Sequence, residues 1–314
     1  MASVSSDTSG DPQGLIQQAR EGAVLFDLDL PILTLKGSDT RRFCNSMFTN
    51  NWRGLAVGGG HHNAMTDPKG RLMGLLDGWM LAEDRALLVL DGMDAEETYD
   101  RLDMYIIMDP IELKRLAGDH AVLHLAGPGA EAALGGLGLP VPEADVAELE
   151  AGWVLRNERV GLPGFDLVLP VDAARQVWQG SELPKAGQGV FEALRIEQRL
   201  PRWPRDMGER AFPHELGLRD RVCSFTKGCY IGQEVINRME TMGKLNRQLA
   251  LVELDEPVTG PVFVGEQAVG ELTSAARVGE RSLGLGLLRK PAWEEGAVLR
   301  IEAEGGSRNG SVIV

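Results

Sequence analysis

The chain has 314 residues, too many for one small hydrophobic core, and this length predicts two or three domains. Its net charge of −14 argues against a general binder of nucleic acid or membrane surfaces, because phosphate groups would be repelled. Three cysteines in so long a chain argue against a disulfide framework. The start is polar, and no run of about 18 apolar residues follows. We therefore expect a cytoplasmic protein with no membrane partner and with disorder over residues 1–19.

Strand and helix patterns alternate in the first third of the chain. Residues 31–37 alternate in polarity and end in glycine, as a strand does, and Ser38 can cap the helix that follows. The other elements expected here are a turn at 67–70, strands at 71–81 and 86–90, an acidic helix from 94 to about 104 and a strand at 111–116.

The same order of elements recurs after residue 120. Residues 122–137 parallel residues 32–47 as a strand, a glycine and a helix, at an offset of 90 residues. Residues 167–183 parallel residues 87–102 at an offset of 80. Either echo alone is compatible with chance, because strand–glycine–helix is a common sequence of elements. Their shared order favours a duplicated α+β unit.

The last 70 residues form short, glycine-punctuated strands without a helical period, which is typical of a small β-barrel or sandwich. Before them, a predicted helix at 190–200 stops at Pro201. The predicted fold class is α+β, with a first unit at 20–117, a second unit at 118–245 and a C-terminal β-barrel at 246–314.

One stretch within the second unit, Thr226–Glu234, reads TKGCYIGQE and carries the clearest chemical signal. Lys227 precedes Cys229 by two residues, and a nearby ammonium favours the reactive thiolate. The pattern also fits a small buried hydrophobe, the usual state of a free cysteine, so both interpretations stay open. Residues 195–247 around it contain eleven Lys or Arg against seven Asp or Glu. An anionic ligand or partner would be guided to this region.

The motif also carries a family resemblance. KGCYIGQE resembles the K-G-C-[YF]-x-G-Q-E signature of the folate-binding YgfZ family, proteins implicated in building or repairing iron–sulfur enzymes. Residues 195–207 resemble the family's R-x-E-x-G-x-P-R-W segment, with Arg199 in place of the usual glycine, and residues 269–288 resemble its G-x-V-T-S segment and the strand after it. The resemblance covers about residues 30 to 300. It implies tetrahydrofolate or a derivative as ligand, iron–sulfur client enzymes or assembly proteins as partners, and a monomer.

The resemblance also implies roles for single residues. Cys229 would be the working nucleophile, or a transient contact for sulfur or a cluster, and Lys227 its electrostatic activator. Arg195 and Trp203 are candidates for folate contacts, although Trp203 suits the covering of a domain seam equally well. The rest of the motif loop comprises Gly228 and Gly232, which would shape it, Tyr230, and Gln233 and Glu234, which would anchor it.

The YgfZ proteins are similar in turn to the aminomethyltransferase (T-protein) of the glycine cleavage system, which implies a three-domain cloverleaf with a central folate pocket. Gly74 and Leu75 fall where the T-protein has paired carboxylates, and Leu162 falls where an acidic residue grips the pterin. Asp77 is displaced by at least two residues, and an odd shift would turn it to the other face of its strand. Asp77, Asp166 or backbone carbonyls would then have to take over folate binding.

The sequence therefore predicts a folate-binding accessory protein for iron–sulfur enzymes that acts through Cys229. A folate-dependent one-carbon transferase is the first alternative, and a module that folate only stabilises is the second. No metal site is expected, because His61 and His62 lie in a glycine-rich stretch predicted to be a solvated loop, without a third ligand at a suitable spacing.

Overall fold

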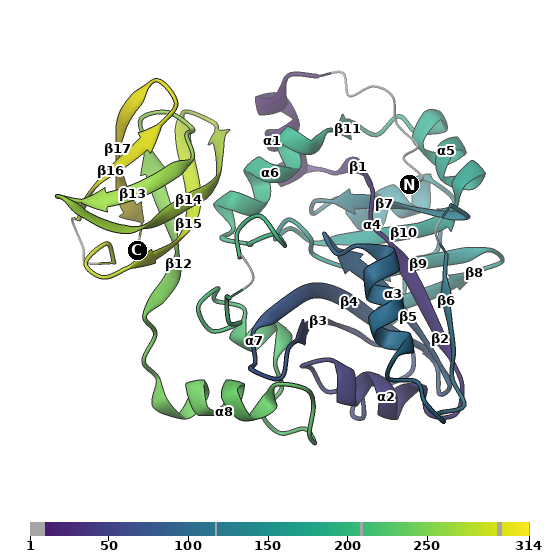
Figure 1. Cartoon of the computed structure of the whole chain (residues 1–314). Coiled ribbons are helices and arrows are strands. Elements are labelled where there is room, and N and C mark those ends of the chain that lie inside the picture. Colours follow the sequence, from purple (N-terminus) through teal and green to yellow (C-terminus); the bar gives the residue numbers. More distant parts are fainter. Residues whose placement is uncertain (1–9, 117, 208–209, 294–296, 314) are drawn as a thin grey trace.

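The computed structural model describes residues 10–116, 118–207, 210–293 and 297–313. Two mixed units and a separate barrel make up the chain (Figure 1). The first unit is built on a five-stranded sheet with the order β3-β4-β5-β2-β6. Its elements are β2 (Ile32–Lys36), α2 (Thr40–Met47), β3 (Gly60–Thr66), β4 (Leu72–Ala82), β5 (Arg85–Asp91), α3 (Ala95–Asp103) and β6 (Glu112–Arg115).

The second unit repeats this arrangement on a six-stranded sheet with the order β8-β9-β10-β7-β1-β11. The strand–helix pairs β2–α2 and β5–α3 of the first unit correspond to β7–α4 and β10–α5 here, which are the echoes seen in the sequence. The predicted duplication is confirmed. The elements of this unit are β7 (His120–Ala126), α4 (Ala130–Gly136), β8 (Val146–Leu149), β9 (Gly152–Arg156), β10 (Gly164–Pro170), α5 (Val171–Gly180) and β11 (Lys185–Ala186).

The N-terminal segment corrects two expectations from the sequence. Residues 12–19, predicted to be disordered, lie in helix α1 (Pro12–Glu21), which the Asp11 side chain caps and which buries Leu15, Ile16 and Ala19. An amphipathic helix becomes ordered when its apolar side finds a core. Strand β1 (Val24–Leu28), predicted to belong to the first unit, pairs with β7 and β11 in the second sheet. Residues 1–9 lie outside the described part of the chain.

Three helices connect the second sheet to the barrel. They are α6 (Gln188–Glu197), α7 (Arg219–Val222) and α8 (Gln233–Met242). Helix α6 packs against α1 and against strand β14 of the barrel. Just after it, Arg199 has a φ of 55°, a left-handed conformation that favours glycine. This backbone conformation explains why the family's R-x-E-x-G-x-P-R-W segment usually has a glycine where this chain has Arg199.

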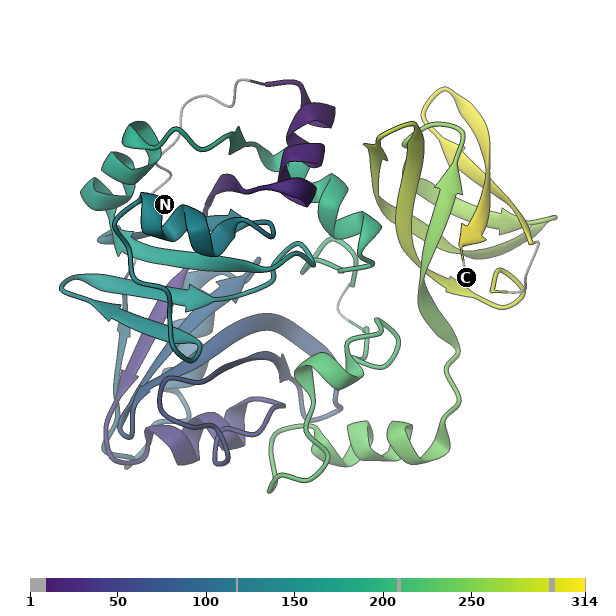
Figure 2. The same ribbon diagram turned by 180° about the vertical axis from the view of Figure 1, so that it is seen from behind.

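The C-terminal strands close into a barrel, as predicted, with the order β12-β15-β14-β13-β16-β17. Figure 2 shows the barrel beside the two units, reached through the chain that runs from α8 into β12. Its strands are β12 (Arg247–Leu254), β13 (Gly260–Val264), β14 (Gln267–Val278), β15 (Arg281–Arg289), β16 (Val298–Ala303) and β17 (Gly306–Ile313). Within the described residues, no helix combines the length and the apolar character needed to cross a membrane.

Candidate functional site

A pocket lies where the two units meet the segments around α6 and α7. The open space among its lining residues, with part of the solvent outside its mouth included, is about 690 Å³. Leucine, valine and phenylalanine side chains form much of its wall, and charged side chains from both units reach it. The residues of its lining that matter below are Leu75, Asp77, Asp91, Arg159, Arg195 and Arg221.

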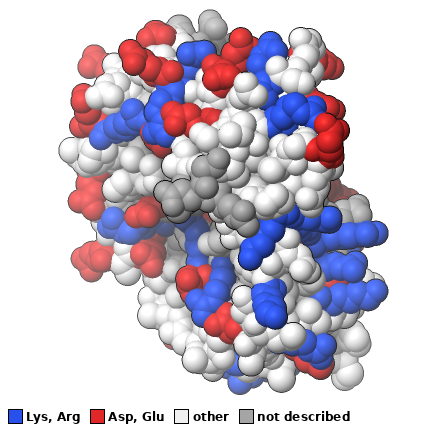
Figure 3. Space-filling view, turned by 90° about the vertical axis from the view of Figure 1, so that its left-hand side faces the viewer, with Lys and Arg blue, Asp and Glu red and all other residues white. Residues whose placement is uncertain are grey.

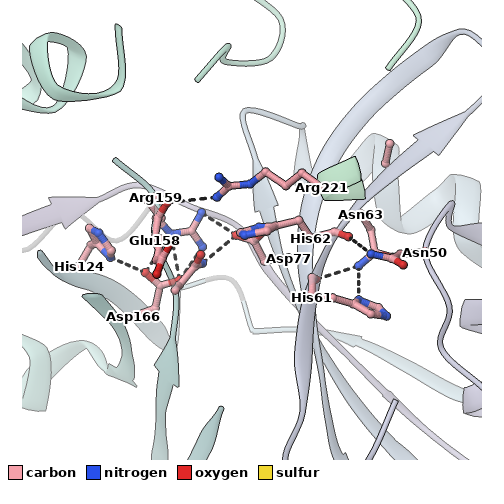
Figure 4. Close-up of polar contacts among 12 residues, drawn as sticks. Asn50, His61, His62, Asn63, Asp77, His124, Glu158, Arg159, Asp166 and Arg221 are labelled. Carbon is pink, nitrogen blue, oxygen red and sulfur yellow. Dashed lines mark hydrogen bonds and ion pairs between the residues drawn. The ribbon is translucent and has the colours of Figure 1, made fainter. Parts of the chain in front are cut away.

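A buried arginine joins the two units beside this pocket. Arg159 Nη1 lies 2.9 Å from Asp77 Oδ2 on β4, and its Nη2 lies 2.6 Å from Asp166 Oδ2 on β10. The side-chain amide of Asn157 donates to both carboxylates at 2.8 Å. The guanidinium is thus shared between a carboxylate of each unit, and Figure 4 shows it between them.

Two histidines extend this line of polar contacts at its ends. His62 Nδ1 pairs with Asp77 on the first unit, and His124 Nδ1 lies 2.9 Å from Asp166 Oδ1 on the second. Burial by itself would raise the pKa of Asp77, but Arg159 and then His62 hold it well below its usual value. The pKa of Asp166 is also lowered. Burial by itself would raise it, but Arg159 and His124 outweigh the effect of burial. Both carboxylates are therefore charged at neutral pH.

Asp77 and Asp166, two predicted folate contacts, are already occupied by protein partners. Asp77 lies two residues after Leu75 on β4, an even step, so both side chains face the pocket and the odd shift considered from the sequence does not occur. Asp166 is fully buried and does not line the pocket. No motif in the sequence pointed to Arg159. The predicted solvated loop at His61 and His62 is wrong, because both residues lie in strand β3.

Arg195 lines the pocket but is held by the protein rather than offered to a ligand. Its guanidinium is 2% exposed and pairs with Glu192 and Asp206. Its Nη2 also donates to Ser274 on the barrel strand β14 at 2.7 Å. The side chain that was predicted to contact folate therefore ties α6 to the barrel.

Trp203 does not line this pocket. Its side chain borders a separate hollow with Met65, Met73 and Met93 on the first unit, and it packs between two hydrophobic clusters. This placement fits the alternative interpretation, a tryptophan that covers a seam between domains.

The motif loop docks onto the first unit. The Thr66 hydroxyl donates to the Ile231 carbonyl, and Ile231 N donates to Ser46 O at 3.3 Å. Gly232, the N-cap residue just before α8, has a φ of 84°, and a Cβ there would lie 2.5 Å from Asp67 O. Only glycine fits this left-handed close approach, so a side chain at position 232 would displace the loop from the first unit.

The remaining loop residues follow the prediction only in part. A Cβ on Gly228 would meet no atom within 4 Å. Gln233 reaches the Lys227 carbonyl at 3.5 Å, whereas Glu234 is exposed and pairs with Arg238 one turn further along α8. Tyr230 is buried, and the Lys227 amine lies 4.6 Å from the centre of its ring.

Lys227 contacts backbone carbonyl groups, whereas the sequence predicted that it would act on Cys229. Its Nζ donates to the carbonyl oxygens of Phe48 and Asn50 on the first unit. Burial lowers the pKa of Lys227 to about 7, against the opposing effect of the thiols of Cys223 and Cys44. Bonded to these two carbonyls, the amine anchors the loop. These contacts argue against its predicted role as activator of Cys229.

Cys229 is exposed, whereas Cys44 and Cys223 are buried. The buried-hydrophobe interpretation of Cys229 is therefore wrong. Burial raises the pKa of Cys223 to about 12 and raises that of Cys44 further. Both buried thiols are held in their unreactive form.

We expect limiting iodoacetamide at pH 7.5 to label Cys229 at least about tenfold faster than Cys44 or Cys223, because the reagent can reach its exposed sulfur whereas the other two are buried. Peptide mapping by mass spectrometry over time measures the three rates. Labelling of Cys44 or Cys223 ahead of Cys229 would contradict the exposure that the structure gives this loop.

Basic side chains gather on one face of this acidic protein. Figure 3 shows Lys and Arg residues crowded toward the lower right of that face. Arg205, Arg247 and Arg289 line an open groove between the barrel and the residues after Pro204. Among the described residues, no group of three or more His, Cys, Asp or Glu is placed to hold a metal ion.

Comparison with known proteins identifies the family of this chain. The model of the GCVT N-terminal domain matches residues 15–227, about two thirds of its length. The chain belongs to the GCVT family. An aminomethyltransferase of Bacillus mycoides is 27% identical over 299 residues, which cover 87% of this chain and 80% of that protein. An aminomethyltransferase of Bacillus cytotoxicus shows the same identity and coverage.

A solved structure confirms the fold of this family member. The glycine cleavage system aminomethyltransferase T from Bartonella henselae superposes with a TM-score of 0.86, covering 96% of this chain and 88% of that one. At 20% sequence identity this likeness shows the fold alone. The predicted T-protein-like arrangement of two α+β units and a β-barrel is thereby confirmed.

Proposed function

We propose that this GCVT family member is a tetrahydrofolate-binding accessory protein for the maturation or repair of iron–sulfur enzymes, of the YgfZ type, and that it acts through Cys229. Folate, or a derivative of it, would occupy the pocket between the two units. The thiol would act on an iron–sulfur client enzyme or assembly protein.

The exposed thiol of Cys229 is the observation that carries this proposal. Of the three cysteines, it alone combines accessibility with a place on a loop that is fixed to the first unit. The KGCYIGQE motif thus has its reactive atom at the surface, where a partner protein can reach it, and its other side chains and backbone hold the loop.

The pocket itself supports binding more than turnover. Leu75 lies in its wall where a carboxylate of the T-protein is expected, and Leu162 packs against the main hydrophobic core. Asp77 faces the pocket but is committed to Arg159 and His62. A folate-dependent one-carbon transferase is the second candidate, favoured by the similarity to aminomethyltransferases over 87% of the chain.

We expect Cys229→Ser to fold and to bind tetrahydrofolate as the wild-type protein does, yet to lower the restored activity of iron–sulfur enzymes at least severalfold in a strain lacking this protein. A serine hydroxyl is not ionised at neutral pH and is a poor ligand for soft metals. Glu234→Gln is the matched control, because Glu234 lies just after the loop in the first turn of α8, its side chain is 90% exposed, and among the described residues its one ion pair is with Arg238. Full restoration by Cys229→Ser at native expression would remove the thiol from the mechanism.

A further inference from the structure

The end of strand β5 carries a carboxylate that none of the preceding roles uses. Asp91 is the last residue of β5 and is the direct cross-strand partner of Leu75 on β4. Residues directly opposite each other in an antiparallel pair project to the same face of the sheet. Both side chains accordingly line the pocket, one apolar and one acidic.

Asp91 differs from the other carboxylates of this region in having acceptor capacity to spare. Among the described residues, its only ion pair is with Arg202 Nε at 3.8 Å, which is too long for a hydrogen bond. Arg202 in turn lies 3.3 Å from Glu192 and over the ring of Phe191, so its charge is divided. Burial raises the pKa of Asp91, against the lowering effects of Arg159 and Arg202. The side chain is a carboxyl group without a full set of partners.

The backbone holds Asp91 in place. The next residue, Gly92, has a φ of 68°, and a Cβ there would lie 2.0 Å from Trp203 O. The backbone at Trp203 therefore packs directly against the residue that follows β5. Backbone packed in this way needs little further ordering when a ligand arrives.

We infer that Asp91 binds the ligand of this pocket through two neighbouring N–H groups, such as the amino group and ring N–H of a 2-amino-4-oxopyrimidine. A carboxylate accepts two parallel hydrogen bonds, and charge-assisted bonds of this kind are among the stronger ones. Leu30, Leu75 and Leu218 supply apolar walls for a flat ring. This inference rests on the proposed function, because the pterin ring of a folate presents such an edge.

Titration calorimetry with 5-formyltetrahydrofolate tests Asp91 directly. Asp91→Asn should weaken binding by about ten- to hundredfold, because the amide offers one acceptor and places a donor against the ligand's second N–H. Asp84→Asn is the matched control and should bind as the wild-type protein does, since Asp84 is an exposed carboxylate on the hairpin between β4 and β5. Thermal melts of both variants check folding.

Removal of the amino group from the ligand provides the second part of the test. The 2-desamino analogue should bind the wild-type protein about ten- to hundredfold more weakly than the parent, yet bind Asp91→Asn with little further loss. Equal affinity of the wild-type protein for the two ligands would overturn the inference even if Asp91→Asn failed to fold. Parent binding unchanged by Asp91→Asn would overturn it while folate binding stood. A wild-type protein that binds no folate would overturn both this inference and the proposed function.

Discussion

Replacement of Arg159 by methionine should destabilise the protein by about 3–5 kcal/mol at pH 7, the cost typical of breaking a buried ion pair by removing one partner. Methionine keeps much of the side-chain length but leaves Asp77 and Asp166 as charged groups facing each other across the junction of the two units. Asn157 would remain their one shared donor. Urea unfolding monitored by circular dichroism measures the free energy of unfolding.

The pH dependence of this loss has a definite sign. In the wild-type protein the pKa values of Asp77 and Asp166 are lowered, so the stability they contribute is present above the unfolded-state pKa, about 4, and is lost as the pH falls. Without Arg159, burial favours protonation of both groups. As the pH falls, protonation removes the repulsion between the two buried charges in the variant. The difference in stability between the two proteins should therefore shrink from pH 7 to pH 4.5.

Arg175→Met is the control, because Arg175 is exposed and pairs with Asp172 one turn away on α5. Its loss should stay within about 1 kcal/mol, as for most surface ion pairs. If Arg159→Met cost no more than Arg175→Met, the buried network would not hold the units together.

The fold was largely predictable because its signals are local and repeated. The two echoes at offsets of 90 and 80 residues became strand–helix pairs at equivalent places in the two sheets, and the glycine-punctuated tail became the barrel. Strand β1 escaped prediction because its pairing is not local. It lies near α1 in sequence but inserts between β7 and β11, more than 90 residues away.

The site was predictable only where a contiguous motif marked it. The KGCYIGQE motif singled out Cys229 but left open whether it is buried. It gave no sign of the partners of Lys227, because Phe48 and Asn50 are about 180 residues distant. No motif of the sequence gave Arg159 or Asp91 a functional role, because each meets its partners only where strands distant in the sequence come together. Arg195 shows the reverse case: its motif was recognised, yet its guanidinium serves the packing of α6 on the barrel.

The purified protein should catalyse the transfer of an aminomethyl group to tetrahydrofolate at least about 10²–10⁴-fold more slowly than an aminomethyltransferase measured alongside it, the usual contribution of one positioned acid or base. Leu75 cannot move a proton. Asp77 faces the same pocket, but Arg159 and His62 keep its pKa far below neutrality, and so strongly stabilised a carboxylate is a weak base. An assay with aminomethylated carrier protein measures the rate.

Asp91 decides how a contrary result would be interpreted. It is the pocket carboxyl group whose pKa burial raises, so it is the side chain best suited to take a proton if turnover occurs. Turnover comparable to the aminomethyltransferase, lost in Asp91→Asn but kept in Cys229→Ser, would favour the one-carbon transferase over the accessory protein. Background rates in all three proteins, together with folate binding that depends on Asp91, would leave the pocket as a binding site and the thiol of Cys229 as the group that acts on partners.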